Sequence, residues 1–367
     1  MSQPAYRADH VGSLLRPQTL LDARAAHAAG NLSAEDLGKR EDEAILEVLA
    51  LQKQLGLDVV TDGEYRRGTW LGDMAEAVEG FQPASVMLEW HGPGGGAEAS
   101  TSHIAGAKLR QRRRLTAHES GFLKGHAPAP YKMTMPAPSV FQLSSYQAGV
   151  TDKVYPTRWD LLEEVSAIVR DEVQALVSDG ASYVQFDDAF MAFYLDQGGR
   201  QRLHERGIDL EQSLQQGIRA NNKSLAGADR GRVTIGFHIC RGNSKSRWFA
   251  EGGYDAIAEQ VFGTLDVDRF LLEYDDPART GGFEPLRVVP RGKTVVLGLI
   301  STKLAALESQ DELRRRIDEA AKHVPLENLA LSPQCGFASV AAGNAISLDD
   351  QRRKLELLVE TARKVWG

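Results

Sequence analysis

The sequence predicts an α/β fold, a (β/α)8 TIM barrel in which eight parallel strands alternate with helices. Short apolar, β-branched runs alternate with helical patterns along the whole 367-residue chain, as expected for parallel βα units. We count eight such runs, whereas a doubly wound sheet more often has about five or six strands. The length of the chain also lies in the range of barrel proteins.

The predicted strands end in short segments that are rich in β-branched residues or in polar residues at their last positions. In chain order they are HVGS (10–13), VVTDGE (59–64), YKMTMP (131–136), YVQFDD (183–188), VTIGFHIC (233–240), FLLEYD (270–275), VVLGLIS (295–301) and LALSPQCG (329–336). Amphipathic helical patterns cover 32–56, 159–180 and 310–324.

Residues 75–130 interrupt this alternation. They contain the Gly-rich stretch LEWHGPGGGAEAS and the basic stretch KLRQRRRL, and Gly-rich stretches are typical of loops. We interpret the segment as a loop-like insertion between strands two and three of a single catalytic domain, residues 1–367. The ARTGG and GPGGG stretches lack the spacing of a phosphate-binding loop.

Composition excludes several classes of function. With 42% hydrophobic and 25% charged residues, the chain resembles an average soluble globular protein. Its net charge of -7 does not indicate the basic surface that binds nucleic acid or an anionic membrane. No apolar run approaches the ~18 residues of a membrane span, and the first residues lack a secretory signal. We therefore expect a cytoplasmic protein with small-molecule partners, and self-association into a homo-oligomer remains open.

The polar residues at the predicted strand ends are the candidates for a functional site, because barrel active sites form at the carboxyl ends of the strands. They are Ser13, Glu64, Asp187, Asp188, His238, Cys240, Glu273 and Cys335. The chain has only two cysteines, too few for a disulfide framework, and both belong to this set. A free cysteine is commonly a small buried apolar residue. If that were the role of both cysteines, their location at two strand ends on the same end of the barrel would be a coincidence.

Four of these residues form a predicted metal site. His238 and Cys240 are two positions apart on a strand and therefore point to the same side. Glu273 ends the next strand and Cys335 ends the last one, so all four side chains can converge. Nitrogen, thiolate and carboxylate ligands suit tetrahedral zinc. A structural zinc site is the alternative, but such sites usually use close-spaced ligand pairs.

The ligands also indicate the chemistry of the zinc. Two thiolates and a carboxylate leave the metal electron-rich. This disfavours a hydrolase, because hydrolytic zinc sites usually carry three histidines, or two histidines and a glutamate. Such a zinc can instead bind a substrate thiol as thiolate at neutral pH. Alkylation of a zinc-bound thiol is therefore the predicted reaction, and a zinc-binding protein without catalysis is the alternative from another class.

The set of motifs resembles a known family. GS after strand one, TDGE, QFDD, H-x-C, the glutamate of strand six and PQCG resemble the catalytic, C-terminal barrel of cobalamin-independent methionine synthase, and more closely its single-barrel bacterial relatives, over residues 8–365. The resemblance implies a (β/α)8 barrel, zinc on the four residues above, homocysteine as the acceptor and a separate methyl donor. It implies that Gly12, Ser13, Glu64 and Asp187 hold the amino acid part of homocysteine.

The sequence departs from the family pattern at the ends of strands four and seven, among other places. The family reads DEP after strand four, where this chain reads Asp187, Asp188 and Ala189; we group Asp188 with the substrate-binding residues because a strand-end aspartate commonly binds a polar group. The family's D-x-H-S at strand seven is Gly298 to Ser301 here, with Ile300 at the histidine that is thought to help move protons. The donor is therefore open: folate, a methylated corrinoid or another small electrophile. A relative of the epoxyalkane:coenzyme M transferases is the alternative within the same chemistry.

Overall fold

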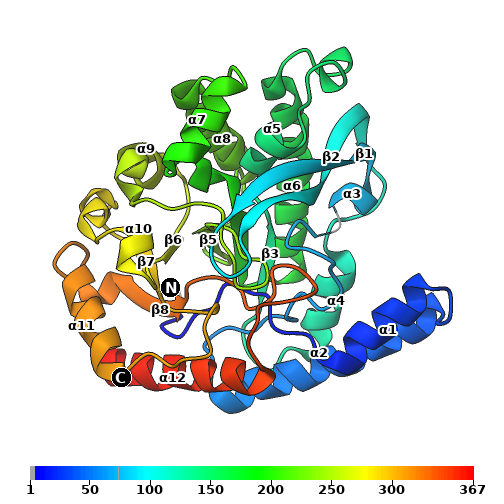
Figure 1. Ribbon diagram of the computed structural model, residues 1–367. Helices are drawn as coiled ribbons and strands as arrows, with labels where there is room; N and C mark the ends of the chain where they lie inside the picture. The colour runs from blue at the N-terminus through cyan, green and yellow to red at the C-terminus, as the bar shows by residue number, and fades with distance from the viewer. Residues whose placement is uncertain (1–4, 73) are drawn as a thin grey trace.

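The computed structural model describes residues 5–72 and 74–367 and contains, within them, a parallel sheet of six strands (Figure 1). In spatial order these are β3 (Lys132–Pro136), β4 (Tyr183–Asp188), β5 (Thr234–Ile239), β6 (Arg269–Glu273), β7 (Thr294–Ile300) and β8 (Leu329–Pro333). All six lie within the strand segments predicted from sequence, give or take one residue. Nearly every residue of these strands is buried, as expected for parallel strands that are covered on both faces.

The first two predicted strands appear as single bridges that close the ring between β8 and β3. Ala8 pairs in parallel with Leu331 of β8, and Val60 pairs in parallel with Tyr131 just before β3. The two bridging segments also meet each other, because the N–H of Asp58 donates to the carbonyl of Ala8 at 3.3 Å. The segments that precede Ser13 and Glu64 therefore take their predicted places in the ring.

The long helices begin and end at the signals in the sequence. α2 (Ala34–Leu55) begins after Ser33, whose side chain accepts from the N–H of Asp36, and ends at Gly56 with a φ of 83°. α6 (Arg158–Asp179) has a capping box and ends at Gly180 with a φ of 96°. Glycine adopts this left-handed conformation without steric cost.

The remaining helices are short or cover the outside of the sheet. They are α1 (Gln18–Ala28), α3 (Met74–Ala77), α4 (Ala117–His126), α5 (Phe141–Ser144), α7 (Gln197–Glu205), α8 (Leu210–Ser224), α9 (Ala258–Thr264), α10 (Pro277–Thr280), α11 (Gln310–Ala320) and α12 (Leu348–Trp366). Among the described residues, none of the helices has the length and apolar character that a membrane span requires.

The insertion is a β-hairpin, which corrects the expectation of a loop-like segment. β1 (Val78–Trp90) and β2 (Gly96–Gln111) pair antiparallel, and Figure 1 shows the cyan hairpin passing across the sheet. Of the Gly-rich stretch that suggested a loop, only residues 91–95 form the turn between the strands, where Gly92 and Gly94 have φ values of 90° and 65°. Short Gly-rich turns are typical of hairpins, so the error lay in extending the turn signal to its flanks.

The interior of the barrel contains a buried polar network below the site. The ammonium of Lys132 donates to Asp9 Oδ1 at 2.6 Å, to the His10 carbonyl at 2.6 Å and to Gln185 Oε1 at 2.8 Å. A lysine ammonium can only donate, so Gln185 must present its amide NH2 to its other neighbours. One of these is Asp187, at the carboxyl end of β4. The network thereby fixes one side chain of the barrel mouth from below.

Candidate metal centre and its cavity

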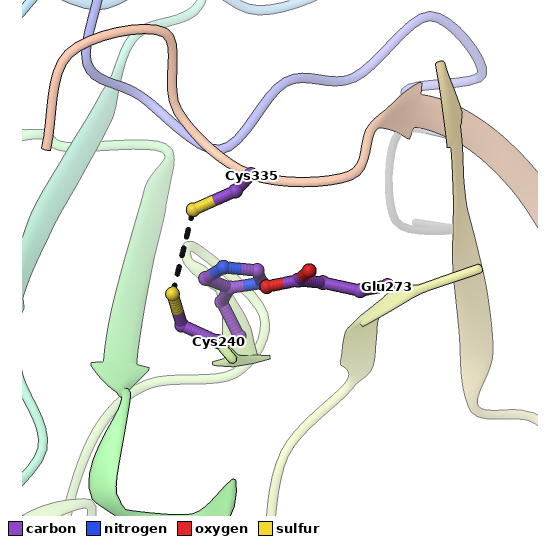
Figure 2. Close-up of side chains that lie close together, drawn as sticks. Cys240, Glu273 and Cys335 are labelled. Carbon is purple, nitrogen blue, oxygen red and sulfur yellow. Dashed lines mark hydrogen bonds between the residues drawn. The ribbon is translucent and has the colours of Figure 1, made fainter. Parts of the chain in front are cut away.

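The structure brings the four predicted metal ligands together at the carboxyl end of the barrel. His238 lies on β5 and Cys240 directly after it, Glu273 ends β6, and Cys335 lies two residues beyond β8. One ligand atom from each lies within 4.8 Å of the others, and all four residues are buried. Figure 2 shows Cys240, Cys335 and Glu273 pointing toward one another, with the two sulfur atoms 3.5 Å apart. This is the size and composition of a single metal site.

His238 has the arrangement of a metal ligand. Its Nδ1 lies 3.1 Å from the carbonyl oxygen of Leu271, so Nδ1 is the nitrogen that carries the proton. Nε2 is buried and has no hydrogen-bond partner among the described residues. A buried ring nitrogen without a partner is costly in an apolar environment. A histidine that donates from one nitrogen to a carbonyl and binds a metal with the other is the common arrangement in zinc sites.

Glu273 is oriented by donors to both of its oxygens. Oε1 accepts from the main-chain N–H of Arg241 at 2.7 Å, and Oε2 accepts from Arg279 Nη1 at 3.1 Å. Burial opposes ionisation, but the positive charges of Arg279 and Lys303 outweigh it and hold the pKa of Glu273 below its usual value. Glu273 is therefore a buried, ionised carboxylate.

The two thiols share a hydrogen bond. Their interaction is the largest cause of two opposite shifts: it lowers the pKa of Cys335 well below its ordinary value and raises that of Cys240 well above it. Two buried sulfur atoms at this distance cannot both ionise without a compensating cation. A divalent metal ion would supply that compensation, and the donor set of one nitrogen, two sulfurs and one carboxylate fits zinc.

A cavity of about 260 Å³ opens beside the cluster. Barrel residues line its inner part: Val11, Ser13, Glu64, Asp187, His238, Cys240 and Cys335. The hairpin supplies part of its outer wall: Val86, Leu88, Trp90 and residues 98–102. The insertion therefore covers the mouth of the barrel and encloses the site, which no pattern in the sequence indicated.

Glu64 points into this cavity from a strained position. It has a φ of 60°, a left-handed conformation that is uncommon for a residue other than glycine and clusters at functional sites. Its Oε1 accepts from the hydroxyl of Thr134 at 2.8 Å, and Arg67 Nη1 lies 3.8 Å away. Burial raises the pKa of Glu64, against the lowering influence of Arg67.

The two aspartates that end β4 point in opposite directions, because successive residues of a strand face opposite sides. Asp187 lines the cavity and accepts from Gln185 Nε2 at 2.7 Å. Burial raises the pKa of Asp187 to about 7. Asp188 instead accepts from Ser139 Oγ at 2.5 Å and from the N–H of Met191 at 2.7 Å, and it does not line the cavity. The geometry thus separates Asp188 from the predicted substrate-binding residues.

The segment Gly12–Ser13 packs tightly against the loop that carries Cys335. A Cβ on Gly336 would lie 1.9 Å from Ser13 Oγ, and a Cβ on Gly12, whose φ is 144°, would lie 2.7 Å from Thr134 Cγ2. Ser13 lines the cavity, whereas Gly12 lies between the lining residues on either side of it. Glycine at positions 12 and 336 lets the chain pass close to the site.

The sequence analysis did not identify some of the residues that surround the cluster. Arg279 lies in the ARTGG stretch, which suggested only a loop. The ammonium of Lys303 donates to Asn243 Oδ1 at 2.8 Å and to the Gly242 carbonyl at 3.2 Å, which fixes the loop after Cys240. Ile300 is fully buried, and neither Ile300 nor Lys303 lines the cavity.

The basic stretch 110–114 is engaged with acidic residues. Arg110 pairs with Glu79, and Arg114 pairs with Glu172 and Asp179. Arg114 also borders a second cavity of about 810 Å³ next to the first.

Comparison with known proteins agrees with this geometry. Residues 8–364 match the family model described as "Cobalamin-independent synthase, Catalytic domain". YxjG of Bacillus subtilis, an uncharacterized protein, is 38% identical over 99% of this chain and 96% of its own. The crystal structure of a putative vitamin-B12 independent methionine synthase from Listeria monocytogenes covers all of both chains at 27% identity with a TM-score of 0.75. A B12-independent methionine synthase from a Shewanella species, solved in complex with selenomethionine, covers 98% of this chain and 97% of its own at 19% identity with a TM-score of 0.74. These likenesses confirm the predicted barrel fold.

Proposed function

The chain belongs to the family of cobalamin-independent synthase catalytic domains, and on that premise we propose that it is a zinc-dependent methyltransferase with homocysteine as acceptor. The observation that carries the proposal is the buried cluster of His238, Cys240, Glu273 and Cys335, in which His238 Nε2 has no other partner among the described residues. The cavity beside this cluster is small enough to hold the acceptor close to it.

The four ligands determine what a bound zinc would supply. A bound Zn²⁺ would lower the pKa of the acceptor thiol and so favour its thiolate at neutral pH. The two thiolates and the carboxylate around the metal would leave that bound sulfur electron-rich and therefore reactive. Arg279 and the N–H of Arg241 hold Glu273 in place for this role. Leu271 fixes the tautomer of His238 through its carbonyl.

The carboxylates of Glu64 and Asp187 would bind the ammonium group of homocysteine and so orient its thiol. Both line the cavity, and among the described residues no lysine or arginine side chain does. Ser13 lies on the same wall and presents a hydroxyl group. A thiol that carries an amine fits this environment.

The same lining argues against the coenzyme M alternative. A sulfonate thiol would bring a negative charge next to Glu64 and Asp187, and no lysine or arginine of the described lining could receive it. Like charges in a dry pocket commonly cost several kcal/mol. The Shewanella relative was solved in complex with selenomethionine, which supports an amino acid as the ligand of this chain. A zinc site with an adjoining cavity suits catalysis better than a purely structural role.

Substitution of the sulfur ligands tests the proposal. We expect one zinc per chain in the wild-type protein, and the loss of most of the metal and all methyl transfer in Cys240→Ser and Cys335→Ser. The barrel should stay folded by circular dichroism, because its large core does not depend on the site. His27→Ala, at an exposed histidine, is the control. Full zinc occupancy in both serine variants, or a cobalt-substituted spectrum that homocysteine leaves unchanged, would contradict the proposal.

A further inference from the structure

Four aromatic side chains meet in the outer wall of the cavity, and the mechanism so far does not use them. Trp70 lies in the loop after the second bridging segment, Trp90 at the end of β1, Phe190 after β4 and Phe249 in the loop after Cys240. Trp70 is half-buried and the other three are buried. They come from four separate parts of the chain and all line the space beside the metal cluster.

The rings form a connected corner. Trp90 and Phe249 are 5.5 Å apart and Trp70 and Phe190 are 6.4 Å apart, both in edge-to-face geometry. Phe190 and Phe249 lie 6.2 Å apart with 30° between their planes, which joins the two pairs into one chain of rings. A corner of this kind can present more than one ring surface to a small ligand. Aromatic corners bind methylated cations through cation–π attraction.

The described lining of the inner cavity holds no lysine or arginine that would repel a cation. Among the described residues, its lining contains the carboxylates of Glu64, Glu98 and Asp187 and both cysteines but no lysine or arginine. The guanidinium of Arg247 is outside the lining; it stacks 5.1 Å from the centre of the Trp90 ring and binds Glu98 at 2.7 Å. Trp90 therefore already carries a cation on its ring, which leaves Trp70, Phe190 and Phe249 as the main contacts for a ligand.

The neighbouring cavity of about 810 Å³ has the opposite character. Thr69, Leu71 and residues 101–102 belong to both walls. Its lining includes the arginines Arg24, Arg66, Arg113 and Arg114, with the acids Glu41 and Glu76. The cationic side chains are thus kept out of the inner cavity, where the methyl group must be transferred.

We propose that this aromatic wall binds the methyl donor and that the donor is an onium compound, a sulfonium or quaternary ammonium. The inference rests on the proposed function and names the chemical class of its second substrate. An onium donor needs no proton when it reacts: the thiolate sulfur of the acceptor forms the new S–CH3 bond, and the donor's S–CH3 or N–CH3 electron pair returns to its heteroatom. The leaving group is then a neutral thioether or tertiary amine.

The groups around the cavity agree with a donor that needs no proton. Ile300 stands at the position of the family histidine, Lys303 is held by the loop after Cys240, and Asp188 faces away. Glu64 and Asp187 are assigned to the ammonium group of the acceptor. A donor whose leaving group would be an amine anion needs a proton, whereas the leaving group of an onium donor is a neutral molecule. The cavity of about 260 Å³ also lies just below the roughly 300–1,000 Å³ of pockets for drug-sized ligands, which suits two small substrates.

Binding of a non-reactive cation tests the wall directly. On the zinc-loaded protein, we expect tetramethylammonium to bind on the order of tenfold more tightly than its neutral analogue tert-butanol, by calorimetry and by quenching of tryptophan fluorescence. Trp70→Leu should remove this preference, Trp70→Phe should keep most of it, and Trp366→Leu, at the C-terminal end of α12, should not change it. With homocysteine, trimethylsulfonium should yield methionine and dimethyl sulfide in equal amounts.

The outcomes separate this inference from the proposed function. Equal binding of the cation and the neutral analogue, or wild-type preference in Trp70→Leu, overturns the onium site. Zinc content and homocysteine binding, measured on the same samples without any donor, decide the proposed function independently. Methyl transfer from methyltetrahydrofolate but not from trimethylsulfonium would also overturn the onium inference while leaving the thiol methyltransferase intact.

Discussion

Arg279 holds one oxygen of Glu273, at 3.1 Å, while the other oxygen is held by the main-chain N–H of Arg241 at 2.7 Å. Arg279 is itself buried, pairs with Asp275 and lies 5.3 Å from the centre of the Trp248 ring. The carboxylate therefore cannot rotate freely, and its lone pairs are directed before any metal binds. Groups that orient a ligand from behind contribute strongly to metal affinity.

We predict that Arg279→Gln weakens zinc binding by roughly 10- to 100-fold while the fold is retained. The reason is that Glu273 loses its charged donor and can turn away from the metal position. Competition with a chromophoric chelator measures the affinity. Arg287→Gln, at an exposed arginine, is the matched control. Equal zinc affinity in Arg279→Gln and the wild type would show that the Arg241 N–H alone orients the ligand.

Glu64→Gln should raise the KM for homocysteine by roughly 10- to 100-fold, because a hydrogen bond to a charged partner contributes about 1.5–3 kcal/mol. Glutamine can still accept from Thr134, so the side chain should keep its place. The wild type should prefer homocysteine to mercaptoethanesulfonate, and the variant should lose much of that preference. Calorimetry on both thiols measures it, with Glu47→Gln on the exposed face of α2 as the control. A wild type that binds the sulfonate thiol better would favour the epoxide-opening alternative.

The binding of an amino acid should depend on pH through Asp187. Burial raises the pKa of Asp187 from its ordinary value of 3.8 to about 7, so the carboxyl is neutral in acid and becomes an anion only as the pH rises through about 7. An ammonium ligand binds the anion, so affinity for methionine should increase across this range in the zinc-free protein. Calorimetry at several pH values follows it, and Asp187→Asn should flatten the curve.

The same pKa shift has a consequence for stability. The folded protein keeps the Asp187 proton at pH values where the unfolded chain has lost it, so this group makes the free energy of unfolding fall as the pH rises from 3.8 to about 7. In denaturant unfolding, the free energy of unfolding should fall with rising pH over this range in the wild type, and it should fall less in Asp187→Asn.

The binding prediction for Asp187 has its own contradicting outcome. An affinity for methionine that falls with rising pH in the same range would contradict the assignment of Asp187 to the ammonium group.

Turnover with methyltetrahydrofolate and homocysteine should be slow or absent. A tertiary amine donor needs a proton source, and general acid help is typically worth ~10²- to 10⁴-fold. By the resemblance to the family, Ile300 stands where a histidine is expected, and the side chains of Asp188 and Lys303 are engaged outside the cavity. Steady-state assays measure the turnover rate with the folate and with an activated methyl donor. Folate-dependent methionine formation at about 1 per second or more would show that another group delivers the proton.

The cluster of four candidate ligands could be predicted from the sequence because the positions of its residues follow from local geometry. Strand alternation puts His238 and Cys240 on one side, and the order of parallel strands puts Glu273 and Cys335 at the same end of the barrel. The helix caps at Ser33 and Gly56 are equally local. Six strands and the helices α2, α6 and α11 could therefore be located from the pattern of apolar residues.

Only the tertiary structure decided which groups surround the metal ligands. Strand alternation predicts that Asp187 and Asp188 differ, but the contact of Asp188 with Ser139 was needed to show which one faces outward. The Gly-rich turn concealed the hairpin, because pairing between β1 and β2 depends on residues far apart in the chain. No regular sequence separation links Arg279 or the aromatic residues of the wall to the four candidate ligands, so no sequence pattern could predict their positions. Their positions result from packing between distant segments, whereas the positions of the four candidate ligands follow from strand alternation and the common direction of the parallel strands.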